Sequence, residues 1–507
     1  MTLLLTTIQS ENPASELTLK YLYGIVADSP LLTRFKIFKN LDLDAKVYEE
    51  IVRGQYDIVY LHVDEYNEHR ICNIADMVKK AMPNAAIVVG GMQVSFDTQS
   101  FMDEHPYVDY VIRGEGETVM FNFLKSLITY DYSFETIPGL GFRQAGKIIV
   151  NPFDVLTEMD QLPFPYNELD VTETKEVYYE TMRGTSDRSI YNQMMPDARV
   201  RSLSLERICT EIRCFIVQGV KRVVILDKFF NYNTDRAYRI FEYIINNDNG
   251  LITFELNING DNLDDETIRL LAEARDGLFV FNLDIATTNA ETLDTIGREA
   301  NIYQMMYNVS KLIQRGNIKV QLSITAGLPN ETEELFARSF NKVFGLGEGS
   351  SLQIKMLQIP KGSKLRNDIE NYGYIFRSGA PYEVLTSNFI NATSLININM
   401  MSKLTALYVN GSFVNSIDKI LTDTGIKPYD MFNKFAHFVY DGKLESKLNK
   451  KENLYRLLYK FASTIYDEFD DALKLQILQE TIHSDLEKTL PPDAVKKFER
   501  KGWEIDA

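Results

Sequence analysis

The residues Ala85-Ala86-Ile87-Val88-Val89-Gly90-Gly91-Met92-Gln93 join a run of apolar and β-branched side chains to a pair of glycines. Such a run is typical of a buried strand, and the glycines allow the tight turn that a strand end requires. Four similar runs, separated by amphipathic helical stretches, occupy the first 130 residues: Leu3–Ile8, Arg34–Phe38, Tyr56–Val63 and Val108–Ile112. This alternation predicts an α/β fold with a doubly wound, Rossmann-like parallel sheet over residues 1–130.

A second glycine-rich turn follows the last of these expected strands. In a doubly wound sheet, ligands bind beyond the carboxyl ends of the strands, at the point where the strand order reverses. Both turns fall at such ends, so we predict that their residues bind a cofactor: Gly90, Gly91, Met92, Gln93, Gly114, Glu115, Gly116 and Glu117. The alternative is that the glycines serve the fold alone, because sheets of this class need tight turns there.

The rest of the chain divides into three parts. Residues 131–170 are expected to form a connector stiffened by prolines, as in Leu162-Pro163-Phe164-Pro165-Tyr166. Residues 171–385 contain six further strand signals with helical stretches between most of them, which predicts a full or partial TIM-like barrel of the (β/α)6 kind. Residues 386–507 carry leucine and aromatic positions at helical spacing and predict an all-α extension.

Charge and cysteine content exclude several classes of protein. The 507 residues carry 54 Lys and Arg against 71 Asp and Glu, so the net charge of −17 makes nucleic acid an improbable partner. No apolar run approaches the roughly 18 residues of a membrane span, which predicts a cytoplasmic protein with no membrane partner. The three cysteines, Cys72, Cys209 and Cys214, form no CxxC pair, which excludes a disulfide framework and a cysteine-ligated metal site of ordinary spacing.

Several motifs, in their order and spacing, resemble those of the cobalamin-binding radical S-adenosylmethionine proteins that carry a helical carboxy-terminal extension. The matching stretches run through 89–95, 108–117, 178–184 and 326–329, and the resemblance covers essentially the whole chain. It implies a cobalamin-binding first domain, a radical S-adenosylmethionine barrel and cobalamin as a cofactor. A histidine motif of the methionine-synthase kind is missing from the first domain, as it is from many members of this family.

The resemblance fails at the iron–sulfur cluster. Members of the family hold a [4Fe-4S] cluster with three cysteines spaced Cys-x3-Cys-x2-Cys after the first barrel strand, and the corresponding residues here are Thr185, Ser189 and Asn192. Neutral hydroxyl and amide groups do not replace thiolates on iron, so we expect no cluster. Asp284 and Ala286 also alter the strand that approaches S-adenosylmethionine, so the sequence supports that ligand less than it supports cobalamin.

A group of histidines and carboxylates lies at the end of the third expected strand. His62 and His69 accompany Asp64, Glu65 and Glu68, and such a group could bind a divalent metal or cap a cobalt ion. The alternative is a solvated loop, and no metal site is predicted here. No nucleophile with an evident base identifies a catalytic residue.

Three functions follow from these observations. The first is a cobalamin-dependent methyltransferase that has lost radical chemistry, because methyl transfer by a corrinoid needs no iron. The second is a non-catalytic pseudoenzyme that serves as a scaffold or partner subunit for an active homologue, a peptide or a biosynthetic complex. In the third, the residues around the old cluster position line a polar pocket for another small molecule: Thr185, Asp187, Ser189, Asn192 and Asp284.

Overall fold

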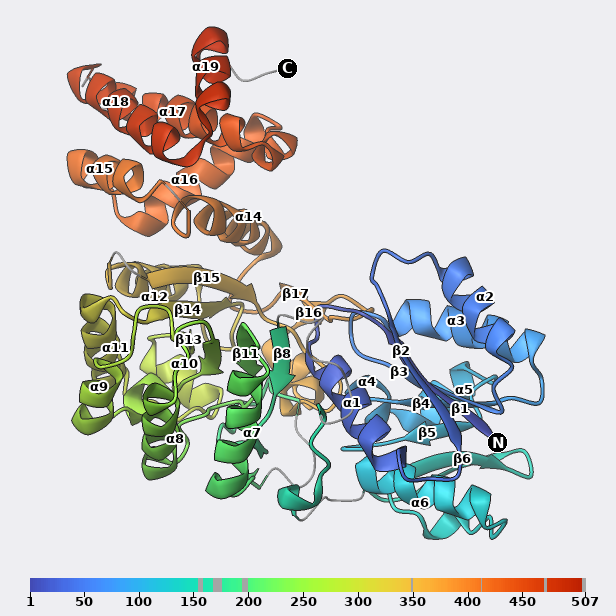
Figure 1. The fold of residues 1–507 in the computed structure, drawn as a ribbon. Helices are drawn as coiled ribbons and strands as arrows, with labels where there is room; N and C mark the ends of the chain where they lie inside the picture. The colour runs from blue at the N-terminus through green and yellow to red at the C-terminus, as the bar shows by residue number, and fades with distance from the viewer. Residues whose placement is uncertain are drawn as a thin grey trace.

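The computed structural model describes residues 1–153, 158–166, 176–193, 199–347, 350–411, 413–468 and 472–503. Two parallel sheets with their covering helices lie beside each other, and a group of helices is stacked on the second (Figure 1). The predicted α/β architecture with a helical carboxy-terminal region is therefore confirmed.

The first sheet has a parallel part that is wound in two directions. The strand order is β2-β1-β3-β4-β5. The inner strands β1, β3 and β4 are buried because helices cover their faces, whereas the edge strand β2 is partly exposed. The chain moves from β1 outward to β2 and then crosses back to β3, so the strand order reverses between β1 and β3. The elements are β1 (Thr2–Ile8), α1 (Ala14–Val26), β2 (Leu32–Phe38), α2 (Asp44–Gly54), β3 (Ile58–His62), α3 (Glu68–Ala81), β4 (Ala86–Gly90), α4 (Met92–Ser95), α5 (Thr98–Glu104), β5 (Tyr110–Ile112) and α6 (Glu117–Ile128).

A hairpin extends this sheet beyond the expected domain boundary. The strands β6 (Leu140–Gln144) and β7 (Lys147–Val150) pair antiparallel with β5 and with each other, and Phe142 is buried in the core of the sheet. The connector expected from residue 131 therefore includes two strands of the first domain. Its glycines and prolines concealed the hairpin, because they weaken the pattern by which a strand is recognised.

The second sheet is a partial barrel. Its six strands are all parallel and follow the chain in the order β8-β11-β12-β13-β14-β15, with β8 and β15 as its two edges. The strands are β8 (Glu176–Tyr179), β11 (Arg222–Ile225), β12 (Thr253–Asn257), β13 (Phe279–Ala286), β14 (Lys319–Ala326) and β15 (Ser350–Met356). The helices are α7 (Leu205–Val217), α8 (Thr234–Asn246), α9 (Asp265–Leu271), α10 (Ala290–Thr295), α11 (Ile302–Arg315), α12 (Glu333–Phe344) and α13 (Ile369–Tyr372). Two small antiparallel pairs accompany it: β9 (Met182–Arg183) with β10 (Arg201–Ser202), and β16 (Ile375–Phe376) with β17 (Val384–Thr386).

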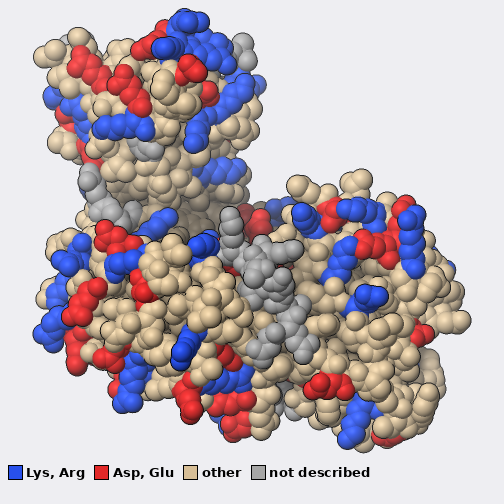
Figure 2. All heavy atoms as spheres, viewed as in Figure 1, with Lys and Arg blue, Asp and Glu red and all other residues tan. Residues whose placement is uncertain are grey.

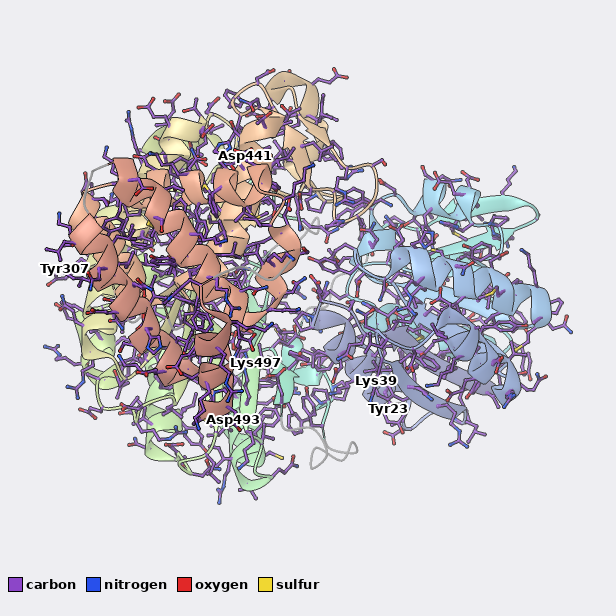
Figure 3. All side chains as sticks on the ribbon, turned by 90° about the horizontal axis from the view of Figure 1, so that it is seen from above. Tyr23, Lys39, Tyr307, Asp441, Asp493 and Lys497 are labelled. Carbon is purple, nitrogen blue, oxygen red and sulfur yellow. The ribbon has the colours of Figure 1, made fainter. Side chains whose placement is uncertain are left out.

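The carboxy-terminal helices stack on the barrel, not on the first domain (Figures 1 and 3). They are α14 (Ala392–Tyr408), α15 (Val414–Thr424), α16 (Pro428–Asp441), α17 (Lys451–Glu468), α18 (Ala472–Thr489) and α19 (Pro492–Lys501). Seen from above, Asp493 and Lys497 of α19 lie over the barrel, whereas Tyr23 and Lys39 belong to the domain beside it. Aromatic side chains hold the helices together, as in the stacked rings of Phe435 and Phe461, 4.3 Å apart.

The surface carries both signs of charge. On the face drawn in Figure 2, acidic and basic side chains are interspersed over all three parts of the molecule. A phosphate backbone would require a basic stripe, which the described residues of this face do not present. Within the described residues, no helix is both long enough and apolar enough to span a bilayer.

Glu331, between β14 and α12, is completely buried. One carboxyl oxygen accepts a hydrogen bond from the Thr287 hydroxyl, and the other has no hydrogen-bond partner among the described residues. Burial raises the pKa of Glu331 to about 8. The folded protein therefore keeps a proton that the unfolded chain releases above its ordinary pKa of 4.5, and the free energy of unfolding falls as pH rises between these values.

We expect Glu331→Gln to remove this dependence, because an amide carries no titratable proton. The stability of the variant relative to the unsubstituted protein should rise by about 1 kcal/mol per pH unit between pH 5 and pH 8, measured by urea unfolding. Glu334→Gln is the matched control, because Glu334 is exposed and pairs only with Arg338 on the same helix. Equal pH profiles for Glu331→Gln and the unsubstituted protein would contradict the raised pKa.

Candidate functional site

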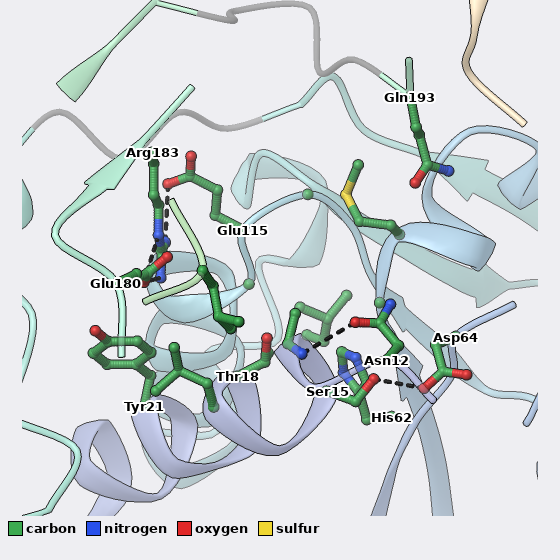
Figure 4. Close-up of a pocket in the computed structure, with 18 of the residues that line it drawn as sticks. Asn12, Ser15, Thr18, Tyr21, His62, Asp64, Glu115, Glu180, Arg183 and Gln193 are labelled. Carbon is green, nitrogen blue, oxygen red and sulfur yellow. Dashed lines mark hydrogen bonds and ion pairs between the residues drawn. The ribbon is translucent and has the colours of Figure 1, made fainter. Parts of the chain in front are cut away.

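A cavity of about 410 Å³ lies where the carboxyl ends of the two parallel sheets meet (Figure 4). The first domain contributes the loop after β1, the end of β3 and the turns after β4 and β5. The barrel contributes Met182, Arg183 and Lys228, which follow β8 and β11. The cavity therefore occupies the sheet edge at which a doubly wound fold binds its ligands.

Five of the eight predicted cofactor-binding residues line this cavity, namely Gly91, Met92, Gly114, Glu115 and Gly116. The other three are engaged elsewhere. A Cβ atom at Gly90 would overlap the Tyr60 ring. Gln93 donates hydrogen bonds to Glu68 at 2.7 Å and to the Tyr382 hydroxyl at 2.6 Å, and buried Glu117 accepts one from Arg183 at 2.6 Å.

The surroundings of the glycines differ between the two turns. Gly91 has φ of 119°, and a Cβ atom there would collide with the Val63 carbonyl oxygen, so internal packing alone requires this residue. Gly116 has φ of 90°, but a Cβ atom there would be no closer than 3.4 Å to Ile112. Both turns line the cavity, but an added Cβ atom would collide with the backbone of the first domain at Gly91 and not at Gly116.

The histidines and carboxylates that were expected to form one group lie in different surroundings. His62 and Asp64 are buried in the cavity wall and Glu65 also lines it, whereas His69 is exposed at the start of α3. Asp64 accepts hydrogen bonds from Ser10 and Ser15, both at 2.6 Å, which fasten the loop after β1 to the end of β3. The described residues contain no group of three or more histidine, cysteine or carboxylate side chains placed to hold a metal ion.

The buried imidazole of His62 is uncharged near neutral pH. Burial lowers the pKa of His62 to about 4, although the neighbouring Asp64 acts in the opposite direction. Its Nδ1 atom lies 3.3 Å from the Tyr60 hydroxyl oxygen. Tyr60 is itself buried and lines the same cavity.

Ion pairs join the first domain to the barrel along one wall of the cavity. Arg183 pairs with Glu115 at 3.2 Å, with Glu117 at 2.6 Å and with Glu180 at 2.7 Å, and Arg201 also pairs with Glu115. Figure 4 shows Arg183 between Glu115 and Glu180. Glu115 and Glu117, which the sequence predicted to bind a cofactor, therefore form ion pairs between the first domain and the barrel. Sequence reasoning did not identify Arg183 as their partner, although its position beside Gly184 at the barrel entrance was part of a recognised motif.

The loop at the expected cluster position is held together by hydrogen bonds to the carboxylate of its own Asp187. The Asp187 carboxylate accepts hydrogen bonds from Ser189 Oγ at 2.5 Å and from Asn192 Nδ2 at 2.9 Å, and the Thr185 hydroxyl accepts one from the Asp187 amide at 3.0 Å. Lys228 Nζ lies 3.9 Å from the same carboxylate. Burial raises the pKa of Asp187, but the Ser189 hydrogen bond and the charges of Arg298 and Lys228 outweigh it and leave the pKa lowered.

A second polar group occupies the interior of the barrel. Asp284 pairs with Arg298 at 3.0 Å and with Lys355 at 3.4 Å, and it accepts a hydrogen bond from Ser323 at 2.9 Å. Burial opposes ionisation of Asp284, but Lys355 and Arg298 hold its pKa below the usual range. Asp284 lines a cavity of about 500 Å³ inside the barrel, while Asp187 lines a different one, so the single polar pocket expected around these residues is not formed.

The cysteines are distributed over two domains. Cys72 lies on α3 of the first domain, and Cys209 and Cys214 lie on α7 of the barrel. Both positions on α7 are partly exposed, and the Cys214 sulfur accepts a hydrogen bond from Gln218 of the same segment. No cysteine belongs to the loop around Asp187.

We expect Arg183→Met to destabilise the protein by about 3–5 kcal/mol, because the buried carboxylate of Glu117 would lose its cation. Urea unfolding measures the effect. Arg53→Met is the control, since Arg53 pairs with Glu49 at 3.9 Å on an exposed helix surface and should change stability by less than about 1 kcal/mol. Equal effects of the two substitutions would mean that the interdomain ion pairs contribute no more than surface pairs.

Three protein-family models match successive segments of the chain. The model of the B12 binding domain matches residues 25–124, that of the radical SAM superfamily matches residues 188–343, and that of a protein family of unknown function, DUF4080, matches residues 370–505. The chain is 25% identical over 494 residues to the cobalamin-dependent radical SAM methyltransferase TokK of Streptomyces tokunonensis. That match covers 89% of this chain and 70% of TokK.

Two solved structures share the fold. The cobalamin-dependent S-adenosylmethionine radical enzyme OxsB, with aqua-cobalamin bound, superposes with a TM-score of 0.64 at 12% identity, over 100% of this chain and 84% of OxsB. The radical S-adenosylmethionine methyltransferase TsrM of Kitasatospora setae superposes with a TM-score of 0.60 at 16% identity, over 73% of this chain and 76% of TsrM. The chain is thus a B12-binding radical SAM protein with a carboxy-terminal DUF4080 region.

Proposed function

We propose that this chain binds cobalamin in the cavity between its two sheets and supports methyl transfer without a [4Fe-4S] cluster. The observation that carries the proposal is the contrast between two places in the molecule. The cavity at the sheet edge is open and keeps the Gly114–Gly116 turn, whereas the loop around Asp187 is closed by its own hydrogen bonds.

The lining of the interdomain cavity suits a corrinoid. The rim of a corrin carries neutral amide side chains, and the cavity offers neutral polar partners in Asn12, Thr18 and Gln193. The backbone at Gly114 and Gly116 allows a flat ring to approach closely, because no side chain projects from it. Ile112 and Met92 add apolar surface for the ring faces.

An iron–sulfur cluster does not suit the loop around Asp187. Thr185, Ser189 and Asn192 offer hydroxyl and amide groups where iron requires thiolates. Ser189 and Asn192 are also occupied, because both donate hydrogen bonds to the Asp187 carboxylate. A buried carboxylate would in addition repel an anionic cluster, so no step of the proposed reaction involves one.

Bound cobalamin would supply a methyl group that passes to a nucleophilic acceptor while the bonding electron pair stays on cobalt, which is chemistry that needs no radical. Lys228 lines both the interdomain cavity and the cavity inside the barrel, so these two spaces adjoin at its side chain. The barrel interior would hold the acceptor through polar groups such as Asn282, Gln353 and Lys355. The methyltransferase activity for which TokK is named supports this choice of reaction.

A non-catalytic partner subunit is the second candidate. It is favoured by the pairing of Asp187 with Lys228 and of Asp284 with Arg298, since both carboxylates then have a cation from the chain itself. Such a protein would keep the architecture for contact with another protein and would bind no corrinoid.

Titration with hydroxocobalamin and methylcobalamin, followed by visible absorbance, separates the two candidates. We expect saturable one-to-one binding with a dissociation constant in the micromolar range or tighter, about −8 kcal/mol. Thr18→Trp should weaken binding by at least about 10-fold by filling the cavity, whereas Lys125→Trp on the exposed side of α6 should not. Absence of saturable binding at high micromolar cobalamin would contradict the proposal and favour the partner subunit.

Reconstitution with iron and sulfide tests the cluster separately. The unsubstituted chain should give no stoichiometric iron–sulfur absorbance, because its loop provides no thiolates. The triple variant Thr185→Cys, Ser189→Cys, Asn192→Cys is the comparison that restores the ligand set. A stoichiometric cluster in the unsubstituted protein would refute the loss of radical chemistry.

A further inference from the structure

His62 is the one of the five histidines that lines the interdomain cavity. It ends β3, next to the point where the strand order of the first sheet reverses, and its side chain is almost entirely buried in the cavity wall. Neither of the proposed roles of the cavity, holding the corrin rim or orienting an acceptor, uses this imidazole.

The two ring nitrogens of His62 have different surroundings. Nδ1 lies 3.3 Å from the Tyr60 hydroxyl oxygen, while Nε2 has no hydrogen-bond partner among the described residues. When Nδ1–H donates to the Tyr60 oxygen, Nε2 carries the free lone pair. Histidines that bind metals are commonly held in this way, with one nitrogen fixed by a neighbouring oxygen and the other directed to the metal.

The backbone around His62 fixes the position of the ring. The His62 carbonyl oxygen accepts a hydrogen bond from the Thr7 hydroxyl at 2.9 Å, which ties β3 to β1. A Cβ atom at Gly91 would lie 3.1 Å from His62 Cε1, so the glycine leaves room for the imidazole.

The Asp64 carboxylate accepts its hydrogen bonds from groups other than the His62 imidazole. Its carboxylate oxygens accept hydrogen bonds from Ser10, Ser15 and the Tyr66 amide. His62 is therefore not the base of a carboxylate–histidine pair, and the lone pair on Nε2 remains available for a ligand in the cavity.

We propose that His62 Nε2 is an axial ligand of cobalt in the bound corrinoid and that Tyr60 positions the ring through Nδ1. This inference rests on the proposed binding of cobalamin in the same cavity. His62 lines the cavity from the first domain, and Met182 and Lys228 line it from the barrel.

Electron paramagnetic resonance of the complex with cob(II)alamin tests the ligation directly and does not depend on activity. An axial 14N nucleus splits the cobalt lines into triplets, whereas 15N splits them into doublets. Protein labelled with 15N only at histidine should therefore give doublets, because the benzimidazole nitrogen of cobalamin itself remains 14N. His69→Gln, which alters an exposed histidine near the same sheet edge, should keep the doublets, and His62→Phe should lose them.

Each outcome bears on a different claim. Triplets in the labelled protein, or the absence of nitrogen splitting in a complex that has formed, would overturn ligation by His62 while leaving cobalamin binding intact. Failure of cob(II)alamin to bind would overturn the proposed function together with this inference. If His62→Phe does not fold, as judged by circular dichroism, the labelled unsubstituted protein still decides the question.

Discussion

The pairing of Arg183 with three glutamates is the contact on which the site depends. A buried carboxylate is costly without a cation, and Glu117 at the start of α6 has Arg183 as its ionic partner from the barrel. The same guanidinium reaches Glu115 in the turn that lines the cavity and Glu180 at the end of β8. One side chain of the barrel thus fixes the position of the second glycine turn and, through it, the width of the cavity between the sheets.

Charged side chains of the barrel form ion pairs with one another. Asp187 accepts hydrogen bonds from Ser189 and Asn192. Asp284 pairs with Arg298 and Lys355 and accepts a hydrogen bond from Ser323. Each aspartate brings a negative charge to a buried place, and each is accompanied by a lysine or an arginine. Because each carboxylate has a cation beside it, the cost of burying its charge in the folded barrel is offset within the chain.

The sequence predicted the features that repeat along the chain and missed those that arise from contacts between distant residues. Alternating strand and helix signals predicted both parallel sheets, because each element has its own hydrophobic period. The β6–β7 hairpin was missed, since Gly139, Gly141 and Gly146 interrupt its pattern. The sequence also suggested that Glu115 and Glu117 serve a cofactor, and their pairing with Arg183 depends on a domain contact that no local pattern contains.

The ion pairs also restrict how a ligand enters. Separation of the two domains would expose the cavity fully, but it would leave Glu117 without its cation and remove Arg201 from Glu115. A large ligand is therefore expected to enter through the open mouth of the cavity while the interdomain wall stays closed. Asn12 and Glu65 line the cavity from the loops after β1 and β3 and are joined by a hydrogen bond of 3.3 Å. Because these loops diverge at the reversal of strand order and are joined there by hydrogen bonds, including those of Asp64 with Ser10 and Ser15, they are the part of the site that can move without breaking a buried ion pair.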